Sequence, residues 1–363
     1  MASATIASPS APADLSTLKE ARSSAQAYLQ SRLTNKGSTQ STRQFSIPVI
    51  DLSPSFSPSP AARQAVATQI RDACTNSGFF YITSHGIPAS TCSSALQLAE
   101  RFFKTLPPEK KELLHVKHST LFRGWEPSEY TNVNPADWEE ARAPETKEGF
   151  NWGYEEAFDL TGGDGQYVEL DGSKTIGNVW PAEEDLPGFY EGVKEYYGRV
   201  LELARHLFRL FALSLDLRES HFDAMATHPG GIARLLYYPP SKRPRPLDYE
   251  CFTLLLSSAS PGLEILSPDN HWTSAPPVEG SLIVNVADFM MRWTNGVYKS
   301  TVHRVVNRTT EERYSIPFFF SIKYDQLVKT LPSCISEDNP SKYPPIRAGE
   351  YVLERLKATT KDG

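Results

Sequence analysis

The chain has 363 residues, a length that allows two domains or one large all-β or α/β domain. Lys and Arg number 37 against 43 Asp and Glu, and the resulting net charge of -6 disfavours a binder of nucleic acid or anionic membranes, because no basic excess offsets phosphate groups. Hydrophobic residues make up 40% of the chain, which excludes global disorder.

The first 52 residues divide into an arm and a first strand. Residues 1–44 are rich in Ser, Ala, Thr and Gln, and we interpret them as a flexible N-terminal arm. Ordered structure is predicted to begin at residues 47–52, a short run rich in β-branched residues that is typical of a strand.

Two amphipathic helices and a buried strand follow. Ser59 and Pro60 form an N-cap and first-turn pair, and helical spacing continues until Gly78. Residues 79–83 predict a buried strand, and a second helix is expected from about residue 91 to 103.

Residues 115–185 are rich in loops and show no sustained period. A structureless connection of this length is often a functional cover over a site. Its aromatic residues have two interpretations. They cover a hydrophobic or planar small molecule, or they only anchor a long loop to the rest of the fold. These residues are Trp125, Tyr130, Trp138, Phe150, Trp152 and Tyr154.

The pattern changes from helical to strand-like near Asp216. A long amphipathic helix is predicted from residue 186, and short strand-like runs punctuated by Gly, Pro and Asn come after it. The sequence thus predicts an α+β fold, with a helical N-terminal half packed on a C-terminal β core. The strand-like runs are residues 234–238, 251–256, 262–266, 281–286, 302–306 and 314–320.

The last two of these runs, together with Arg313 directly before the second, carry side chains suited to a ligand. Arg313 and Ser315 are two residues apart, so both project from one face of a strand. An arginine with a neighbouring hydroxyl suits a bound carboxylate, because its guanidinium makes two parallel hydrogen bonds. His303 lies on the preceding strand and could hold a metal nearby, although a lone strand histidine is more often structural.

Several motifs occur together in a fixed order along residues 45–355. They include residues 78–82, 85–88, 237–240, 280–288, 293–296, 300–306 and 313–315. In this order they resemble the Fe(II)/2-oxoglutarate-dependent dioxygenases of the isopenicillin N synthase-like family.

The resemblance implies a double-stranded β-helix (jelly-roll) core that binds Fe(II) and 2-oxoglutarate. By position, His303 and Asp248 match two iron ligands, and Arg313 and Ser315 match the pair that grips the outer carboxylate of 2-oxoglutarate. Two further matches are Tyr238, which assists that pair, and Phe319, which lines the substrate pocket; core packing is the alternative for both. A family member oxidises a small organic molecule with O2, by hydroxylation or desaturation, and releases succinate and CO2.

The resemblance also fixes where domains and partners are expected. Residues 45–220 form the helical region with its cover, and residues 221–363 form the jelly-roll dioxygenase domain. We expect a monomer that binds neither nucleic acid nor membrane. No signal peptide or disulfide-rich pattern is recognised, so a cytoplasmic location is expected.

One departure from the family pattern concerns the iron. Relatives carry a histidine two residues before the aspartate, and this chain has Pro246 there, which has no group that can bind a metal. The segment between Tyr238 and Asp248 is also short by about one strand. Glu250 is the first alternative donor, although a carboxylate would change the charge of the site.

Three explanations stay open for the missing histidine. The first is a dioxygenase whose sequence lacks a piece, through an altered gene model, a splice variant or a deletion. The second is a catalytically inactive pseudoenzyme that keeps the jelly roll as a binding module. The third is an oxidase of the same fold that does not use 2-oxoglutarate, and Arg313 with Ser315 weighs against it. We favour the first, because the residues around the gap still form a coherent site.

Overall fold

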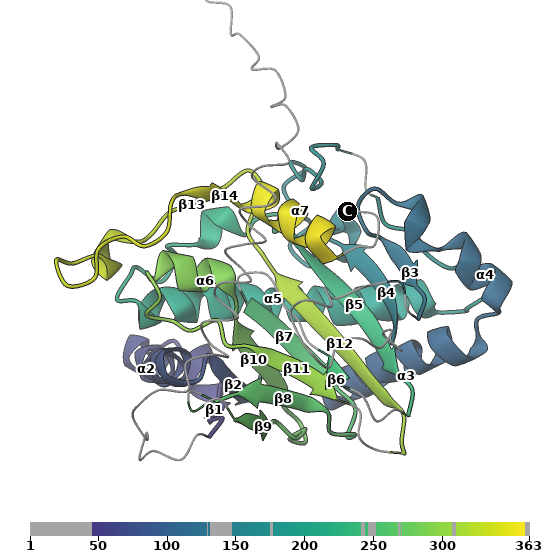
Figure 1. Ribbon diagram of the computed structural model, residues 1–363, viewed down its shortest axis with the longest axis horizontal. Coiled ribbons are helices and arrows are strands. Elements are labelled where there is room, and N and C mark those ends of the chain that lie inside the picture. The colour runs from purple at the N-terminus through teal and green to yellow at the C-terminus, as the bar shows by residue number, and fades with distance from the viewer. Residues whose placement is uncertain are drawn as a thin grey trace, which may run out of the picture.

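The computed structural model in Figure 1 describes residues 46–128, 130, 147–174, 177–240, 244–245, 252–267, 269, 271–306 and 310–359. The predicted arm over residues 1–44 lies outside these ranges. In the described ranges the chain forms two main sheets and a separate two-stranded pair, with the longer helices on one side of the larger sheet (Figure 1).

The helices lie largely where the apolar periodicity predicts them. In α2, Pro60 is the first residue and the Ser59 side chain accepts a hydrogen bond from the Ala62 amide, as the sequence predicts. After α2, Gly78 has a φ of +70°, and a Cβ there would lie 2.1 Å from the Lys299 carbonyl oxygen, so only glycine fits. The helices are α2 (Pro60–Asn76), α3 (Ala89–Thr105), α4 (Pro108–Leu113), α5 (Phe189–Ser214), α6 (Asp288–Trp293) and α7 (Ala348–Thr359).

The larger sheet has eight strands in the order β1-β2-β10-β7-β12-β5-β4-β3. Only the β1–β2 pair within it is parallel. Strands from both halves of the sequence therefore share one sheet. Their bounds are β1 (Val49–Asp51), β2 (Phe79–Thr83), β3 (Gly124–Glu126), β4 (Glu148–Gly153), β5 (Gly231–Tyr238), β7 (Phe252–Ser257), β10 (Leu282–Val286) and β12 (Arg313–Phe320).

The smaller sheet has four strands in the order β6-β11-β8-β9. Its edge strand β6 (Pro244–Arg245) has only two residues and pairs with Val305 and Val306 of β11. The other members are β8 (Leu263–Leu266), β9 (Trp272–Ser274) and β11 (His303–Val306). A separate pair, β13 (Leu327–Val328) and β14 (Ile346–Arg347), precedes α7.

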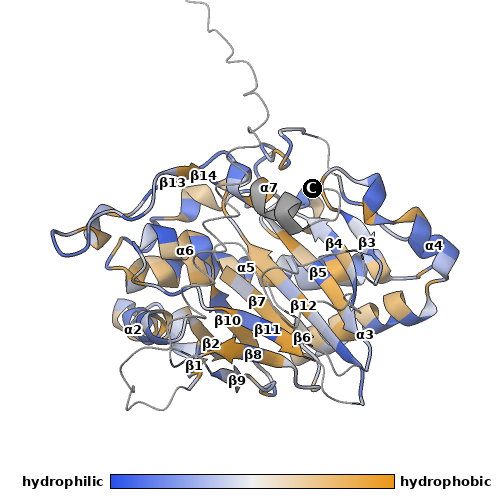
Figure 2. Ribbon diagram, viewed as in Figure 1, coloured by the Kyte–Doolittle hydropathy of each residue, from blue (hydrophilic) through white to orange (hydrophobic). Residues whose placement is uncertain are grey.

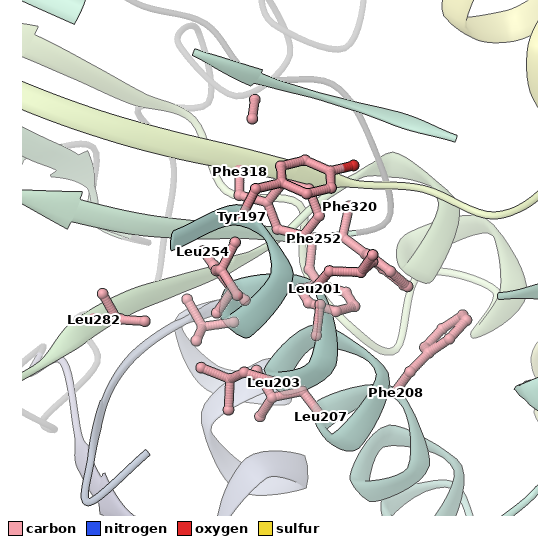
Figure 3. Packing of buried hydrophobic residues seen from close by; sticks show 14 of the residues in the cluster. Tyr197, Leu201, Leu203, Leu207, Phe208, Phe252, Leu254, Leu282, Phe318 and Phe320 are labelled. Carbon is pink, nitrogen blue, oxygen red and sulfur yellow. The ribbon is translucent and has the colours of Figure 1, made fainter. Parts of the chain in front are cut away.

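The main core lies between the helices and one face of the larger sheet. Figure 3 shows α5 packed over this face, with Leu201 and Phe208 near residues of β7 and β12. Phe208 lies 5.4 Å from Phe320 between ring centroids, in an edge-to-face arrangement. Burial of these rings provides much of the hydrophobic driving force that holds the helical half against the sheet.

The opposite face of the larger sheet meets the smaller sheet. Phe79, Tyr81 and Ile283 of the larger sheet form a second apolar cluster with Leu263 and Ile265 of β8. The neighbouring strands β2 and β8 are strongly hydrophobic in Figure 2. Two sheets facing one another across such a cluster form the jelly roll that the resemblance implies. We call this face of the larger sheet the site face.

The loop-rich interpretation of residues 115–185 misses two strands, β3 and β4, which extend the larger sheet beyond β5. Phe150, Trp152 and Tyr154 are at most 1% exposed and belong to the main core. The structure therefore favours a role for these three residues in anchoring the segment to the core, rather than in covering a substrate. Trp138 lies outside the described residues. The division into domains at residue 220 stays a prediction.

Candidate functional site

Arg313 begins β12 on the site face and is only 1% exposed. It lies opposite Tyr238 in the antiparallel register of β12 and β5, and its Cζ is 5.0 Å from the centre of the Tyr238 ring. Its Nη1 donates a hydrogen bond to Ser315 Oγ at 3.1 Å. The structure thus brings together all three residues that the resemblance assigns to the outer carboxylate.

The surroundings of Arg313 suit an anion. Burial lowers the pKa of its guanidinium, although the neighbouring Tyr238 acts in the opposite direction. Its Nε has no hydrogen-bond partner, and in the described part of the chain no carboxylate forms an ion pair with it. A buried cation without a counter-charge is costly, and a ligand carboxylate would remove this cost. The three side chains therefore fit the outer carboxylate of 2-oxoglutarate.

Gly262 provides space beside this group. A Cβ at this position would lie 3.1 Å from Arg313 Cδ and 3.2 Å from the Val306 carbonyl oxygen, which is tighter than ordinary van der Waals contact. Any larger residue would push the arginine away from its present position. Gly262 therefore positions the arginine, and no local sequence pattern indicates this, because the close approach joins residues about fifty positions apart.

His303 begins β11 in the smaller sheet, opposite Ile265 of β8. Its Nδ1 lies 3.1 Å from the Thr301 carbonyl oxygen. A carbonyl can only accept, so Nδ1 carries the proton and the lone pair of the neutral ring is on Nε2. The ring meets Phe79 edge to face with centroids 5.2 Å apart. This hydrogen bond favours the tautomer whose Nε2 can bind a metal.

The donor set for iron is incomplete among the residues that can be described. Asp248 lies outside the described residues, and the position of the family's other histidine is Pro246. The parts of the chain that the structure describes contain no group of three His, Cys, Asp or Glu side chains that could hold a metal ion. These residues therefore do not fit a complete facial triad, which needs two histidines and one carboxylate.

Phe319 lies on the site face in a row of cross-strand partners. Phe79 pairs with Asn285, Asn285 with Thr253, and Thr253 with Phe319. Residues directly opposite in a sheet share a face, so the row connects the ring that contacts His303 with Phe319. The structure therefore brings His303, Phe319 and the Arg313 group to the same side of the larger sheet. The sequence predicts the strand that contains Phe79. It does not predict the contact of Phe79 with His303, because no local pattern shows which strands pair.

Two family models match the chain. One, described as the N-terminal part of a non-haem dioxygenase in morphine synthesis, covers residues 47–183. The other, described as the 2OG-Fe(II) oxygenase superfamily, covers residues 229–322 and so includes His303, Arg313 and Ser315. Both halves of the chain thus match dioxygenase families.

Known proteins agree with these matches. A 2-oxoglutarate-Fe(II) type oxidoreductase, hxnY of Emericella nidulans, is 38% identical over 325 residues, covering 85% of this chain and 89% of the relative. Clavatol oxidase claD of Penicillium crustosum is 32% identical over 335 residues, covering 88% and 98%. The crystal structure of a full-length Neurospora crassa protein in complex with alpha-KG and thymine is similar with a TM-score of 0.73 and 27% identity, covering 86% and 96%.

The chain belongs to the 2-oxoglutarate/Fe(II) oxygenase family. Its function class is that of a dioxygenase-type oxidoreductase that acts on small organic molecules with O2, and the cofactors of its family are Fe(II) and 2-oxoglutarate. Within the described ranges, every helix is too short or too polar to cross a lipid bilayer.

Proposed function

We propose that Arg313, Ser315 and Tyr238 hold the outer carboxylate of 2-oxoglutarate in this chain, and that His303 and Asp248 are its iron ligands. The observation that carries the proposal is the buried guanidinium of Arg313, which donates to Ser315 and has no counter-charge from a described carboxylate. A dicarboxylate supplies that charge and accepts the remaining N–H donors of the arginine fork.

Each residue has a distinct task in this proposal. Arg313 and Ser315 bind the end of the co-substrate that is remote from the metal, and the Tyr238 ring limits the orientation of the guanidinium. Phe319 forms part of the wall against which the organic substrate packs. In a complete family site, iron and 2-oxoglutarate together supply the oxidation of a C–H bond, with succinate and CO2 as products. Pro246 leaves the donor set one ligand short, so the residues present do not form the complete site that this chemistry needs.

We further propose that the chain is a cytoplasmic monomer whose turnover is impaired by the missing ligand. The two-residue length of β6 supports the impaired turnover, because a typical strand has about five to six residues. A short edge strand at this place agrees with the loss of the strand that precedes the aspartate in relatives.

Titration calorimetry with 2-oxoglutarate tests the proposed carboxylate site. The matched ligand is 2-oxobutyrate, which keeps the keto acid and lacks the outer carboxylate. We expect 2-oxoglutarate to bind and 2-oxobutyrate to bind at least about tenfold more weakly, because a charge-assisted pair of hydrogen bonds is lost. Equal affinities, or no binding of 2-oxoglutarate, would contradict the assignment of Arg313.

A second candidate function is a catalytically inactive binding module. Pro246 favours it, since a proline cannot be a ligand under any condition. Restoring the missing strand with its histidine separates the two functions. A restored chain that forms succinate supports the impaired enzyme, and a restored chain that binds iron without turnover supports the module.

A further inference from the structure

Asn285 of β10 places an uncharged amide on the site face of the larger sheet. Val284 and Val286, on either side of it, belong to the main core, and successive side chains of a strand point to opposite faces. Asn285 therefore points away from the helices, toward the side on which Arg313 and Phe319 lie. Only 4% of the residue is exposed, so bulk solvent does not saturate its hydrogen-bonding groups.

The amide of Asn285 has no partner in the described part of the chain. Neither its oxygen nor its nitrogen forms a hydrogen bond with another of these residues. A side-chain amide offers an acceptor oxygen and two N–H donors, and the large majority of buried polar side chains have at least one partner. A buried amide without partners destabilises the fold, because its groups have lost their water and gained no other hydrogen bond. A bound molecule that pairs with the amide would remove this loss.

The neighbours of Asn285 place the amide between His303 and the proposed substrate wall. On one side it pairs with Phe79, whose ring contacts the His303 ring with centroids 5.2 Å apart. On the other side it pairs with Thr253, which in turn pairs with Phe319. Neighbouring strands lie about 5 Å apart, so Asn285 is about 10 Å from Phe319 across the sheet.

Phe319 keeps an accessible ring on this face. It is half-buried, whereas the other seven residues of β12 are buried. It belongs to neither of the two apolar clusters, so the neighbouring side chains do not fully cover it. An accessible aromatic ring and an unpaired amide on one row of the sheet form a surface that is apolar except for one hydrogen-bonding group. Such a combination is typical of a site for a small organic molecule.

The proposed co-substrate contacts lie elsewhere on the same face. Arg313 and Phe319 are six residues apart on β12, which corresponds to about 20 Å along an extended strand. Asn285 is level with Phe319 rather than with Arg313, because its row of paired residues passes through Phe319. An uncharged amide also gives no charge-based preference for a dicarboxylate. The organic substrate is therefore a better partner for Asn285 than 2-oxoglutarate.

We propose that Asn285 selects an organic substrate with an amide edge, in which a carbonyl is next to an N–H group, as in a lactam ring. The side-chain oxygen of Asn285 accepts from the N–H of the substrate and its nitrogen donates to the carbonyl, so two parallel hydrogen bonds form. The flat body of the substrate packs on Phe319. The inference rests on the proposed function, because it takes the Arg313 group as the co-substrate site. It adds the class of the organic substrate, which the family alone does not determine.

The test uses 2-pyridone as the probe and 1-methyl-2-pyridone, in which a methyl group replaces the hydrogen on nitrogen, as its matched counterpart. Binding of each is measured by calorimetry on the full chain saturated with 2-oxoglutarate, so that Arg313 is already occupied. We expect 2-pyridone to bind at least about fivefold more tightly, because methylation removes one hydrogen bond and leaves the Asn285 oxygen unpaired. Equal affinities, or no measurable binding of 2-pyridone, would overturn the proposal.

Two variants locate the selectivity. Asn285→Leu removes the amide at nearly unchanged size and should bring the ratio of the two affinities near one. The control Asn76→Leu makes the same change at an exposed position at the end of α2 and should keep the ratio. A ratio that survives in folded Asn285→Leu contradicts the proposal. Should that variant not fold, Asn285→Val, which suits a strand, decides by the same ratio.

The two proposals fail in different ways. Absence of 2-oxoglutarate binding in the first titration contradicts the proposed function before a probe is added. Asn285→Leu should bind 2-oxoglutarate within about twofold of the unmodified chain, since the amide lies apart from the co-substrate contacts. A loss of about tenfold or more would assign the amide to the co-substrate. That result leaves the proposed function intact and contradicts the selection of the substrate by Asn285 alone.

Discussion

Arg313 and Tyr238 face each other across β12 and β5, with the guanidinium carbon 5.0 Å from the centre of the tyrosine ring. The aromatic face covers one side of the cation, and Ser315 accepts from one of its nitrogens. A planar cation held in this way presents its remaining N–H groups in a fixed direction, which is the geometry that a carboxylate recognises.

The first prediction concerns the fork of Arg313. Arg313→Lys should weaken 2-oxoglutarate binding about 10- to 100-fold, because a charged hydrogen bond contributes about 1.5–3 kcal/mol and an ammonium cannot form the paired bonds. Calorimetric titration measures the change. The control Arg209→Lys keeps the same substitution at the surface and should leave the affinity unchanged. Equal 2-oxoglutarate affinity in Arg313→Lys and the unmodified chain would show that another residue binds the co-substrate.

The second prediction concerns the chain as its sequence stands. Iron affinity should be at least about 10- to 100-fold below that of a complete site, since even the loss of a residue that supports a ligand has an effect of this size. Coupled succinate formation should be low or absent. Inserting a strand that ends with His two residues before Asp248 should restore both iron binding and oxygen-dependent succinate formation.

The matched control is the same insertion with Ala in place of His. It restores the length of the strand without the histidine ligand. The free energy of unfolding should therefore rise while iron binding stays weak. Tight Fe(II) binding by the unmodified chain would contradict the prediction and would indicate another donor, with Glu250 the first to test.

The third prediction tests whether Trp152 anchors the hydrophobic core or belongs to a cover over the substrate. Trp152 is 1% exposed and lies 6.0 Å from Trp180 and 6.4 Å from Tyr197 between ring centroids. Trp152→Ala should lower the free energy of unfolding by about 3–5 kcal/mol through the cavity it leaves. Trp125→Ala, at a partly buried position, should lower the free energy of unfolding by clearly less. Denaturant unfolding measures both free energies, and a loss in Trp152→Ala as small as that of a surface substitution would show that Trp152 does not anchor the core.

The sequence predicts those features of the fold that depend on residues close together along the chain. The spacing of Arg313 and Ser315 placed them on one face of a strand, and the hydrogen bond between them confirms this. Helix α2 begins at the predicted Ser59–Pro60 pair for the same reason, because the cap and the first turn are adjacent in sequence.

Features that depend on distant pairing could not be predicted in this way. Strand β4 carries glycines at both Gly149 and Gly153, which weaken the strand pattern, and it exists because it pairs with β5. Arg234 and Glu126 are separated by 108 residues, and only the order of strands in the sheet brings them together. Whether Asp248 and His303 lie close together stays a prediction.

The last prediction concerns acid stability and rests on Asp159, a buried carboxylate remote in sequence from the proposed ligands. Burial alone raises the pKa of Asp159, but hydrogen bonds from Arg205, Thr161 and Tyr154 outweigh it and lower the pKa from 3.8 to about 2. Arg205 contributes two of these bonds, each 2.7 Å long.

Because the folded state holds the ionised form of Asp159, the stabilisation is complete above the unfolded pKa of 3.8 and disappears as the pH falls through about 2. Allowing for solvent screening, the contribution is about 1–2 kcal/mol. The difference in unfolding free energy between the unmodified chain and Asp159→Asn should therefore narrow by this amount between about pH 6 and the acid limit of folding. Arg205→Gln should show the same narrowing, since it removes the largest group of favourable bonds to the carboxylate. A difference that stays constant with pH would show that Asp159 does not titrate with a lowered pKa, and that its contacts with Arg205 stabilise the fold only through packing.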